Sequence, residues 1–306
     1  MTLPTSLSLD AIARPSGALA MVAMDQRDSL RTMFLHAGQQ SVSPETMTEF
    51  KLTVARSLGP LASGFLIDRQ YGFDRVRSEH LLPPATGLIL AADALTQEPG
   101  GPVEDTDLDQ LVLSPDYDLS GVAAVKLLLI WRRDARRADR IELARRFARS
   151  ATERGLLSVL EPVVRATPAE QAAGGFDTEA AIGEAAAELS GVGQSLYKVQ
   201  VPLGGRSLGR RLDEELARLN DCITGPWVVL SQGVAAADFH DAVLAACRAG
   251  ASGFLAGRAL WADVVGRPDL ATALAEVSVP RLRRLCATVD AYARPWAEAA
   301  ARGRTA

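Results

Sequence analysis

Eight short apolar runs, separated by longer helical segments, are the feature that most constrains the fold of this chain. The runs are Ala18–Asp25, Gly64–Asp68, Gly87–Ala91, Val122–Ile130, Leu157–Val163, Leu196–Val201, Trp227–Ser231 and Gly253–Ala256. Strands that alternate with helices form a parallel sheet with right-handed crossovers. Eight such units within about 250 residues are typical of a (β/α)8 or TIM barrel. We therefore predict an α/β protein in which residues 1–306 form a single TIM barrel domain.

The segments between the runs have the period of amphipathic helices. The clearest are Pro44–Leu58, Ala135–Glu153, Thr178–Leu189, Leu208–Asn220 and Ala236–Ala249. A doubly wound open sheet is the alternative, but no predicted strand is followed by a glycine-rich nucleotide-binding motif. The irregular stretch Asp93–Ser120 is rich in Pro, Gly and Asp and follows the third strand. We predict that it forms a wall of the active site and holds a short helix, with a plain surface insertion as the alternative.

The composition argues against several classes of protein. The net charge of −4 disfavours a nucleic-acid-binding surface. Cys222, Cys247 and Cys286 are odd in number and lack the spacing of a zinc site, so we expect neither a disulfide framework nor structural zinc. No stretch reaches 18 uninterrupted apolar residues, and Met1–Gly17 lacks the pattern of a signal peptide. We expect a cytoplasmic protein with no membrane partner.

Lysine is rare in this chain, because only three of the 33 basic residues are lysines. Lysine, unlike arginine, can lose its proton near neutral pH and attack a carbonyl to form a Schiff base. Lys126 and Lys198 both lie in predicted strands, where a charge is costly. Pairing with a core carboxylate is the alternative for either one, but two on separate strands favour catalysis. Lys51 lies in a helix-like stretch and is expected on the surface.

Polar residues near the carboxyl ends of the predicted strands should converge on one pocket of the barrel. They are Asp25, Gln26, Arg27, Asp68, Arg69, Gln70, Asp93, Lys126, Glu161, Lys198, Ser231 and Arg258. Lys126 and Glu161 come from consecutive strands, and Lys198 shares a strand face with Gln200. A second cation and partial desolvation both lower the pKa of a lysine. The set therefore predicts a Schiff-base nucleophile with carboxylates beside it.

The loops after the last two strands predict an anion site. Ser231-Gln232-Gly233 follows the seventh strand, and Gly257-Arg258 follows the eighth. Barrel enzymes often bind phosphate with these two loops through backbone N–H groups and a helix N-terminus. The arginine adds a bidentate donor. A phosphate site beside a barrel lysine indicates a sugar phosphate substrate, whereas a glycine turn with a surface arginine is the alternative.

Metal-dependent chemistry has less support in the residues. The three histidines are scattered, and none follows a predicted strand, whereas a zinc-dependent aldolase site needs clustered histidines. A carboxylate-only magnesium site built from Asp25, Asp68 and Asp93 stays open as the alternative. We expect no metal and no other cofactor.

Several motifs together resemble the class I aldolases that include tagatose-1,6-bisphosphate aldolase. The motifs are Ala23-Met-Asp25-Gln-Arg27, Val125-Lys126-Leu-Leu-Leu-Ile-Trp131, Leu160-Glu161-Pro-Val-Val-Arg165, Leu196-Tyr-Lys198-Val, Val229-Leu-Ser231 and Gly253-Phe-Leu-Ala-Gly-Arg258-Ala-Leu-Trp261. Within this family the chain is most similar to the sulfofructosephosphate aldolases of sulfoquinovose breakdown. The resemblance implies a homo-oligomeric TIM barrel that cleaves 6-deoxy-6-sulfofructose 1-phosphate to dihydroxyacetone phosphate and 3-sulfolactaldehyde.

The same resemblance implies a role for each site residue. Lys198 would form the Schiff base, with Lys126 as its cationic neighbour. Glu161 would be the acid and base for iminium formation and hydrolysis, while Asp25 would position the substrate and help move the proton of the C4 hydroxyl. The implied anion ligands are Ser231, Gly233, Gly257 and Arg258 for the C1 phosphate, and Gln26 and Arg27 for the distal sulfonate or phosphate.

Two residues depart from the family pattern. Gln200 stands where relatives usually carry Glu, and Gln232 stands where they carry a small residue. The first change removes a carboxylate near Lys198, and the second alters the phosphate loop. Tagatose 1,6-bisphosphate or a related ketose bisphosphate is the alternative substrate, since sulfonate and phosphate are both tetrahedral oxyanions. A non-catalytic sugar-phosphate sensor is the alternative of another class, but sensing needs the anion site and not the amine.

Overall fold

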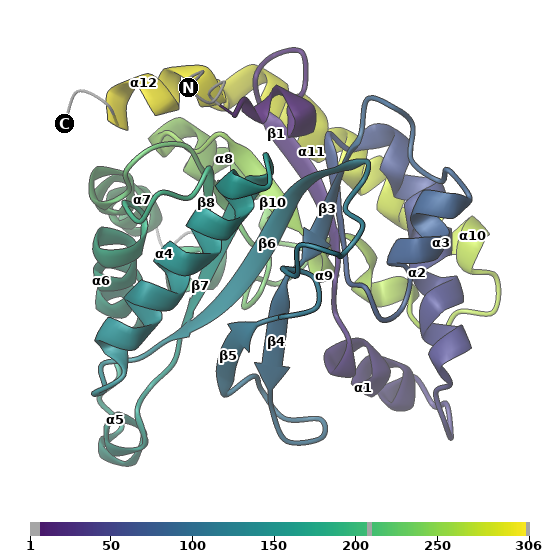
Figure 1. Ribbon diagram of the computed structural model, residues 1–306, viewed down its shortest axis with the longest axis horizontal. Coiled ribbons are helices and arrows are strands. Elements are labelled where there is room, and N and C mark those ends of the chain that lie inside the picture. Colours follow the sequence, from purple (N-terminus) through teal and green to yellow (C-terminus); the bar gives the residue numbers. More distant parts are fainter. Residues whose placement is uncertain (1–6, 207–209, 304–306) are drawn as a thin grey trace.

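The computed structural model describes residues 7–206 and 210–303, and its centre is a closed barrel of parallel strands (Figure 1). The barrel strands are β1 (Leu19–Met24), β2 (Gly64–Ile67), β3 (Gly87–Ala91), β6 (Val122–Trp131), β7 (Leu157–Val164), β8 (Leu196–Val199), β9 (Trp227–Val229) and β10 (Gly253–Ala256). They follow the chain order around the barrel, and β10 pairs with β1 to close it. The predicted single-domain TIM barrel and all eight predicted strands are confirmed.

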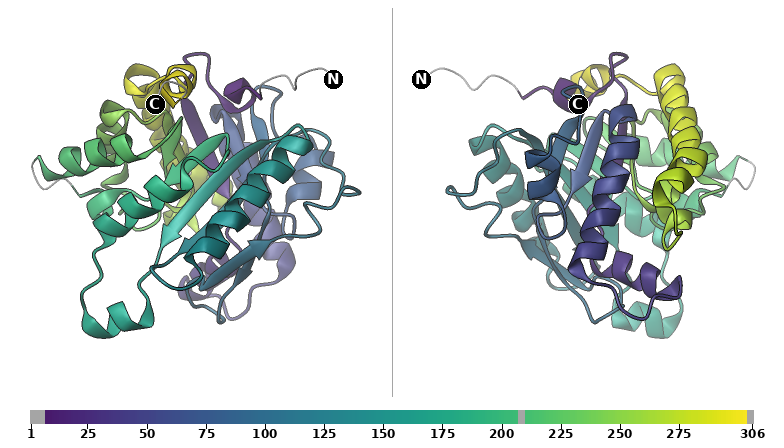
Figure 2. Two further views of the ribbon diagram at one scale, coloured as in Figure 1. Left: turned by 60° about the vertical axis from the view of Figure 1, so that its left-hand side comes forward. Right: turned by 90° about the vertical axis from the view of Figure 1, so that its right-hand side faces the viewer.

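Helices lie around the outside of the barrel and at its two ends (Figure 2). They are α1 (Asp28–His36), α2 (Pro44–Leu58), α3 (Phe73–Ser78), α4 (Arg137–Glu153), α5 (Pro168–Ala173), α6 (Thr178–Leu189), α7 (Arg211–Cys222), α8 (Phe239–Ala249), α9 (Arg258–Trp261), α10 (Leu270–Ala273), α11 (Val279–Tyr292) and α12 (Trp296–Gly303). The predicted bounds of α2 and α6 are confirmed, and the predicted start of α7 at Leu208 lies outside the described residues. Within residues 7–206 and 210–303, no helix is long and apolar enough to cross a membrane.

Local sequence explains where several of these helices begin. The Ser43 hydroxyl accepts a hydrogen bond from the backbone N–H of Thr46, and Pro44 occupies the first turn of α2. Asp177 caps α6 in the same way, through the backbone N–H of Ala180. The strands read as continuous apolar runs because helices cover their outer face while the barrel interior buries the other.

Alternate residues of the strands fill the interior of the barrel. The apolar layer there contains Leu19, Met21, Ala23, Leu66, Ile89, Ala91, Ala124, Leu157, Val159, Leu196, Val228 and Leu255. Since strand side chains alternate between two faces, the residue two positions after this layer also points inward. On β6, β7 and β8, those residues are Lys126, Glu161 and Lys198. The strand register alone therefore brings these three side chains into one enclosed volume.

The stretch after β3 forms an antiparallel hairpin, and the prediction of a short helix there is wrong. β4 (Asp93–Thr96) pairs with β5 (Asp105–Leu108), and no helix occurs between residues 93 and 120, all of which are described. The Pro and Gly residues that disfavour a helix form the connecting loop between the two strands. Ion pairs of Arg132 with Glu104 and of Arg136 with Asp105 anchor the hairpin to the β6–α4 loop. In Figure 1 it lies at the same end of the barrel as α1 and α5, opposite α12.

Candidate active site

A cavity of about 420 Å³ opens where the barrel strands end. Its lining contains Asp25, Gln26, Arg27, Lys126, Glu161, Lys198, Ser231, Gly257 and Arg258 from the predicted set. The other predicted residues, Asp68, Arg69, Gln70, Asp93 and Gly233, do not line it. Gly233 is exposed, and its φ of +82° shapes the turn after Ser231. The hairpin contributes one wall of the cavity through Leu95, Gln97, Gly100, Gly101, Pro102 and Val103.

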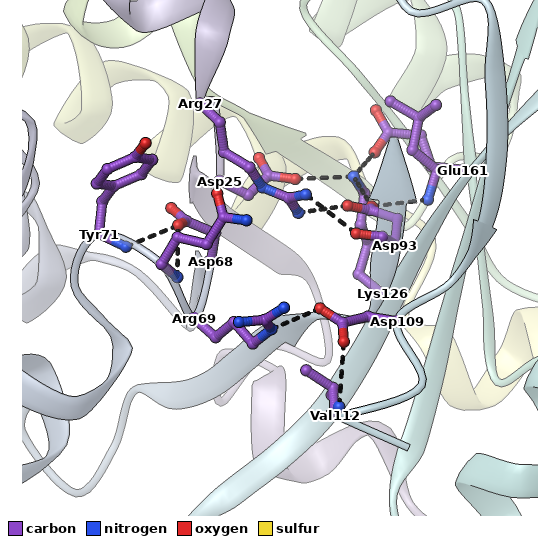
Figure 3. Close-up of polar contacts among 12 residues, drawn as sticks. Asp25, Arg27, Asp68, Arg69, Tyr71, Asp93, Asp109, Val112, Lys126 and Glu161 are labelled. Carbon is purple, nitrogen blue, oxygen red and sulfur yellow. Dashed lines mark hydrogen bonds and ion pairs between the residues drawn. The ribbon is translucent and has the colours of Figure 1, made fainter. Parts of the chain in front are cut away.

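Lys126 is the centre of the buried charge cluster (Figure 3). Its Nζ donates hydrogen bonds to Asp25 Oδ2 at 2.7 Å and Asp93 Oδ2 at 3.1 Å, and it lies 2.9 Å from Glu161 Oε2. Burial by itself would lower the pKa of Lys126, but attraction to the three carboxylates outweighs burial and raises the pKa well above its usual value. Lys126 therefore stays charged, which suits an electrostatic role and not nucleophilic attack.

Lys198 has the opposite electrostatic balance. Its Nζ lies 2.8 Å from Glu161 Oε1, and the residue is only 3% exposed. Burial lowers the pKa of Lys198, and the Lys126 cation lowers it further, although Glu161 opposes both effects. The net shift is downward, so more of the neutral amine is available at a given pH. Glu161 thus bridges the two lysines, with one carboxylate oxygen toward each.

Asp25 follows the inward register of β1 and lies mostly buried beside both lysines. Burial alone would raise the pKa of Asp25, but Lys126 and Lys198 hold it well below its usual range. Asp25 is therefore an ionised carboxylate at the floor of the cavity, within hydrogen-bond distance of Lys126.

Asp93 connects the cluster to the rim of the cavity. This carboxylate is 1% exposed and accepts hydrogen bonds from Lys126, from the backbone N–H of Leu128 and from the Arg27 guanidinium. Arg27 Nη1 also donates to the backbone carbonyl of Asp93 at 3.0 Å. Arg27 lines the cavity, but its contacts with the Asp93 carboxylate and carbonyl hold its guanidinium in place. The sequence alone does not predict these contacts.

The opposite side of the cavity carries the predicted phosphate loops. The Ser231 hydroxyl accepts a hydrogen bond from the backbone N–H of Gly257 at 3.3 Å, which joins the loops after β9 and β10. A β carbon at position 257 would come within 2.8 Å of Gln26 Nε2 and 2.7 Å of the Ala23 carbonyl, so only glycine fits there. The Gln26 amide therefore lies against the Gly257 loop. The helix that follows, α9, has only four residues.

The three aspartates considered as magnesium ligands each face a cation. Asp25 pairs with Lys126, Asp93 with Arg27 and Lys126, and Asp68 with Lys51. In the part of the chain that the structure describes, no group of three or more His, Cys, Asp or Glu side chains is arranged to hold a metal ion. Independence from metal stays a prediction.

Sequence comparison places this geometry in a family. A family model described as DeoC/LacD family aldolase matches residues 19–263. The chain belongs to the DeoC/LacD aldolase family. It is 25% identical over 278 residues to a tagatose 1,6-diphosphate aldolase of Listeria monocytogenes, covering 83% of this chain and 80% of the relative. It is 26% identical over 311 residues to tagatose 1,6-diphosphate aldolase 2 of Streptococcus pyogenes, covering 92% and 94%.

Solved aldolase structures share the fold of this aldolase. The fructose-bisphosphate aldolase of Plasmodium falciparum matches with a TM-score of 0.65 at 17% identity, over 96% of this chain and 99% of that one. An archaeal fructose-1,6-bisphosphate aldolase, captured with its catalytic lysine bound to the carbinolamine intermediate, matches with a TM-score of 0.57 at 16% identity, over 92% and 98%. At these identities the likeness shows the barrel alone.

The prediction that Lys51 lies on the surface of the aldolase is wrong. Lys51 is fully buried, and its Nζ forms an ion pair with Asp68 at the end of β2. It lies on the buried face of α2, at helical spacing from Met47 and Val54, so the helix points it at the barrel. The ring of Tyr71 lies 5.5 Å from Nζ. Asp68 follows Lys51 by 17 residues and lies on another element, so the sequence alone does not predict that the two residues pair.

The structure differs from the sequence-based expectation at two further residues. Gln200 Oε1 accepts a hydrogen bond from the backbone N–H of Val164 at 2.7 Å, and Gln200 does not line the cavity. It therefore links the segment after β8 to β7. Arg165 was not proposed as a site residue, yet it lines the cavity directly after β7. Its position after a strand end is the signal that could have identified it.

Proposed function

We propose that this aldolase is a class I enzyme that cleaves 6-deoxy-6-sulfofructose 1-phosphate through a Schiff base on Lys198. The observation that carries the proposal is the buried pair of lysines that share Glu161, because Lys198 has a lowered pKa while Lys126 has a raised one. Only the first suits a nucleophile that must lose its proton. A sensor of sugar phosphates has no need for such a pair.

The proposed reaction uses each charged group of the cluster. Neutral Lys198 attacks the C2 carbonyl, and Glu161 transfers the protons that allow the carbinolamine to lose water and become an iminium ion. Asp25 accepts the C4 hydroxyl proton as the C3–C4 bond breaks, and the bonding electrons move toward the iminium nitrogen to give an enamine. 3-Sulfolactaldehyde leaves, C3 is protonated, and hydrolysis of the iminium releases dihydroxyacetone phosphate and restores Lys198.

The C1 phosphate is assigned to the loops after β9 and β10. Ser231 and Arg258 supply a hydroxyl and a guanidinium, the Gly257 N–H orients the Ser231 hydroxyl, and the Gln26 amide lies beside them. The proposal that the substrate carries a sulfonate at C6 rests on the resemblance of the sequence motifs to those of sulfofructosephosphate aldolases. The curated relatives carry the names of tagatose 1,6-diphosphate aldolases, so a ketose bisphosphate is the alternative. A homo-oligomer and a cytoplasmic location also stay predictions.

A side-by-side assay of purified enzyme tests the substrate. We expect the highest kcat/KM for cleavage of the sulfonated ketose 1-phosphate, lower values for tagatose and fructose 1,6-bisphosphates, and full activity in the presence of EDTA. A preference for a bisphosphate would give the enzyme the specificity of its curated relatives. Absence of cleavage with all three, together with tight binding, would support the sensor, and inhibition by EDTA would support the carboxylate–metal alternative.

Substitution of Lys126 should shift the pH dependence of Schiff-base formation. Lys126→Met removes the cation that lowers the pKa of Lys198 and leaves Asp25 and Glu161 uncompensated, so the pKa of Lys198 should rise. The rate of adduct formation with dihydroxyacetone phosphate and cyanoborohydride, measured against pH, should begin to increase at a higher pH than in the parent. Lys126→Arg keeps the charge and should shift less. An unshifted Met variant would leave burial as the sole cause of the lowered pKa.

A further inference from the structure

The cationic side chains that line the active-site cavity divide into two groups. Lys126, Lys198 and Arg27 each form an ion pair with a carboxylate of the cluster. Arg165 and Arg258 form none with any carboxylate of residues 7–206 and 210–303. Two cations that line a cavity and lack an anionic partner in the described part of the chain are positions for anionic groups of a ligand.

The surroundings of Arg165 strengthen this reading. Its Nε is buried and has no hydrogen-bond partner among the described residues. A buried donor without an acceptor costs free energy, which an oxyanion in the cavity would recover. Burial, with the positive charges of Arg132 and Arg258, lowers the pKa of Arg165, while Glu104 opposes the shift. Glu104 is already paired with Arg132, so net positive charge remains around Arg165.

The barrel order places the two free arginines on opposite sides of the Schiff-base lysine. Arg165 follows β7 and Arg258 follows β10, with β8 and β9 between them. Lys198 lies on β8. If the C1 phosphate lies at Ser231 and Arg258 and C2 lies at Lys198, a ketose chain that runs past Glu161 would reach the end of β7.

The two residues expected at the distal anion, Gln26 and Arg27, are engaged in part. Gln26 Oε1 and Arg27 Nε, like Arg165 Nε, are buried without a hydrogen-bond partner among the described residues, but the charge of Arg27 is balanced by the Asp93 carboxylate. The Gln26 amide lies against Gly257, on the side of the C1 phosphate. Arg27 donates to both the carboxylate and the backbone carbonyl of Asp93. Arg69, which follows the second strand, pairs with Asp109 and does not line the cavity.

We propose that Arg165 binds the anionic group at the distal end of the substrate, and so determines the selectivity of the aldolase for aldehydes that carry a sulfonate or phosphate. This inference rests on the proposed function and names the residue that recognises the end of the sugar at which the proposed and alternative substrates differ. Specificity is a difference between two affinities, so only a contact with the variable group can change it.

Aldol condensation tests the assignment, because the donor and the acceptor can be varied separately. Dihydroxyacetone phosphate is combined with 3-sulfolactaldehyde, with glyceraldehyde 3-phosphate or with uncharged glyceraldehyde. Arg165→Gln should lower kcat/KM for the two anionic aldehydes about ten- to hundred-fold, the loss typical of hydrogen bonds to a charged group, and should change the value for glyceraldehyde by less than about threefold. Arg165→Lys should recover part of the loss.

Two matched variants separate contact from general charge. The double variant Arg132→Gln/Glu104→Gln removes both charges of the neighbouring ion pair without removing a cavity-lining group, and it should keep the ratio between anionic and uncharged aldehydes. Arg258→Gln should raise the KM for dihydroxyacetone phosphate with every aldehyde. Borohydride trapping of dihydroxyacetone phosphate should be the same in Arg165→Gln as in the parent, which checks that the variant is folded.

Each outcome separates the inference from the proposed function. The inference is overturned if Arg165→Gln lowers kcat/KM equally for all three aldehydes, or does not lower it for the two anionic aldehydes. Either result leaves the Schiff-base mechanism in place. Failure of the parent enzyme to form a trapped adduct overturns the proposed function, and the inference fails with it. A selective loss in Arg165→Gln that Arg132→Gln/Glu104→Gln reproduces in full also contradicts the inference, because it would show that the charges around the cavity, and not a contact with Arg165, set the selectivity.

Discussion

Lys198→Arg should abolish the borohydride-trapped adduct with dihydroxyacetone phosphate and lower kcat/KM on the order of 1000-fold or more. Arginine preserves a positive charge beside Glu161 but cannot form an imine. Treatment of the parent with borohydride and dihydroxyacetone phosphate, followed by peptide mass spectrometry, should locate one adduct on Lys198.

Lys126→Arg is the matched control, since it changes the other buried lysine in the same way. This variant should still form the adduct on Lys198, at a reduced rate, because the changed guanidinium geometry disturbs Asp25 and Glu161. An adduct on Lys126 in the parent, or retention of most activity by Lys198→Arg, would contradict the assignment of the nucleophile.

Lys51→Met should destabilise the protein by about 3–5 kcal/mol, the usual cost of removing one partner of a buried ion pair. Lys51 is fully buried, and its loss leaves the Asp68 carboxylate without its cation. Asp68 would keep only the two backbone hydrogen bonds from Gln70 and Tyr71, both at 2.9 Å. The free energy of unfolding from urea titration, followed by circular dichroism, measures the effect.

Arg56→Met provides a control on the same helix. Arg56 pairs with Glu79 at the surface, where both side chains are more than a third exposed, and its removal should cost less than about 1 kcal/mol. The double variant Lys51→Met/Asp68→Asn should recover part of the loss, because the asparagine oxygen can still accept the two backbone hydrogen bonds. Equal free energies of unfolding for Lys51→Met and Arg56→Met would contradict a stabilising role for the buried ion pair.

The barrel could be predicted because its strands are buried on both faces, so each appears as a continuous apolar run in the sequence. The β4–β5 hairpin could not be predicted, because its strands are short and polar. Their sequences are Asp-Ala-Leu-Thr and Asp-Thr-Asp-Leu. Their stability comes from pairing with each other and from anchors to Arg132 and Arg136. Such contacts between distant residues have no local signature.

The members of the charged cluster could be predicted in part, because the apolar strand pattern also fixes which residues point into the barrel. Lys126, Glu161 and Lys198 follow the inward register of strands that the apolar pattern already defines. The pairings could not be predicted, because Arg27 meets Asp93 across 66 residues and Lys51 meets Asp68 between a helix and a strand end. Which arginines remain free for a ligand therefore becomes visible only in three dimensions.

The hairpin wall has a consequence for how relatives of this enzyme can diverge. The groups proposed for bond cleavage lie on the barrel strands, whereas Leu95, Gln97 and residues 100–103 border the same cavity from an inserted segment. Asp28 joins the two parts by accepting hydrogen bonds from Gln97 and the backbone N–H of Gly100. Surface insertions change in length and sequence at small cost to a barrel. Asp93, the first residue of the hairpin, pairs with Lys126 and must stay. Exchange of the loop between β4 and β5 thus offers a route to new acceptor aldehydes that keeps the lysine chemistry intact.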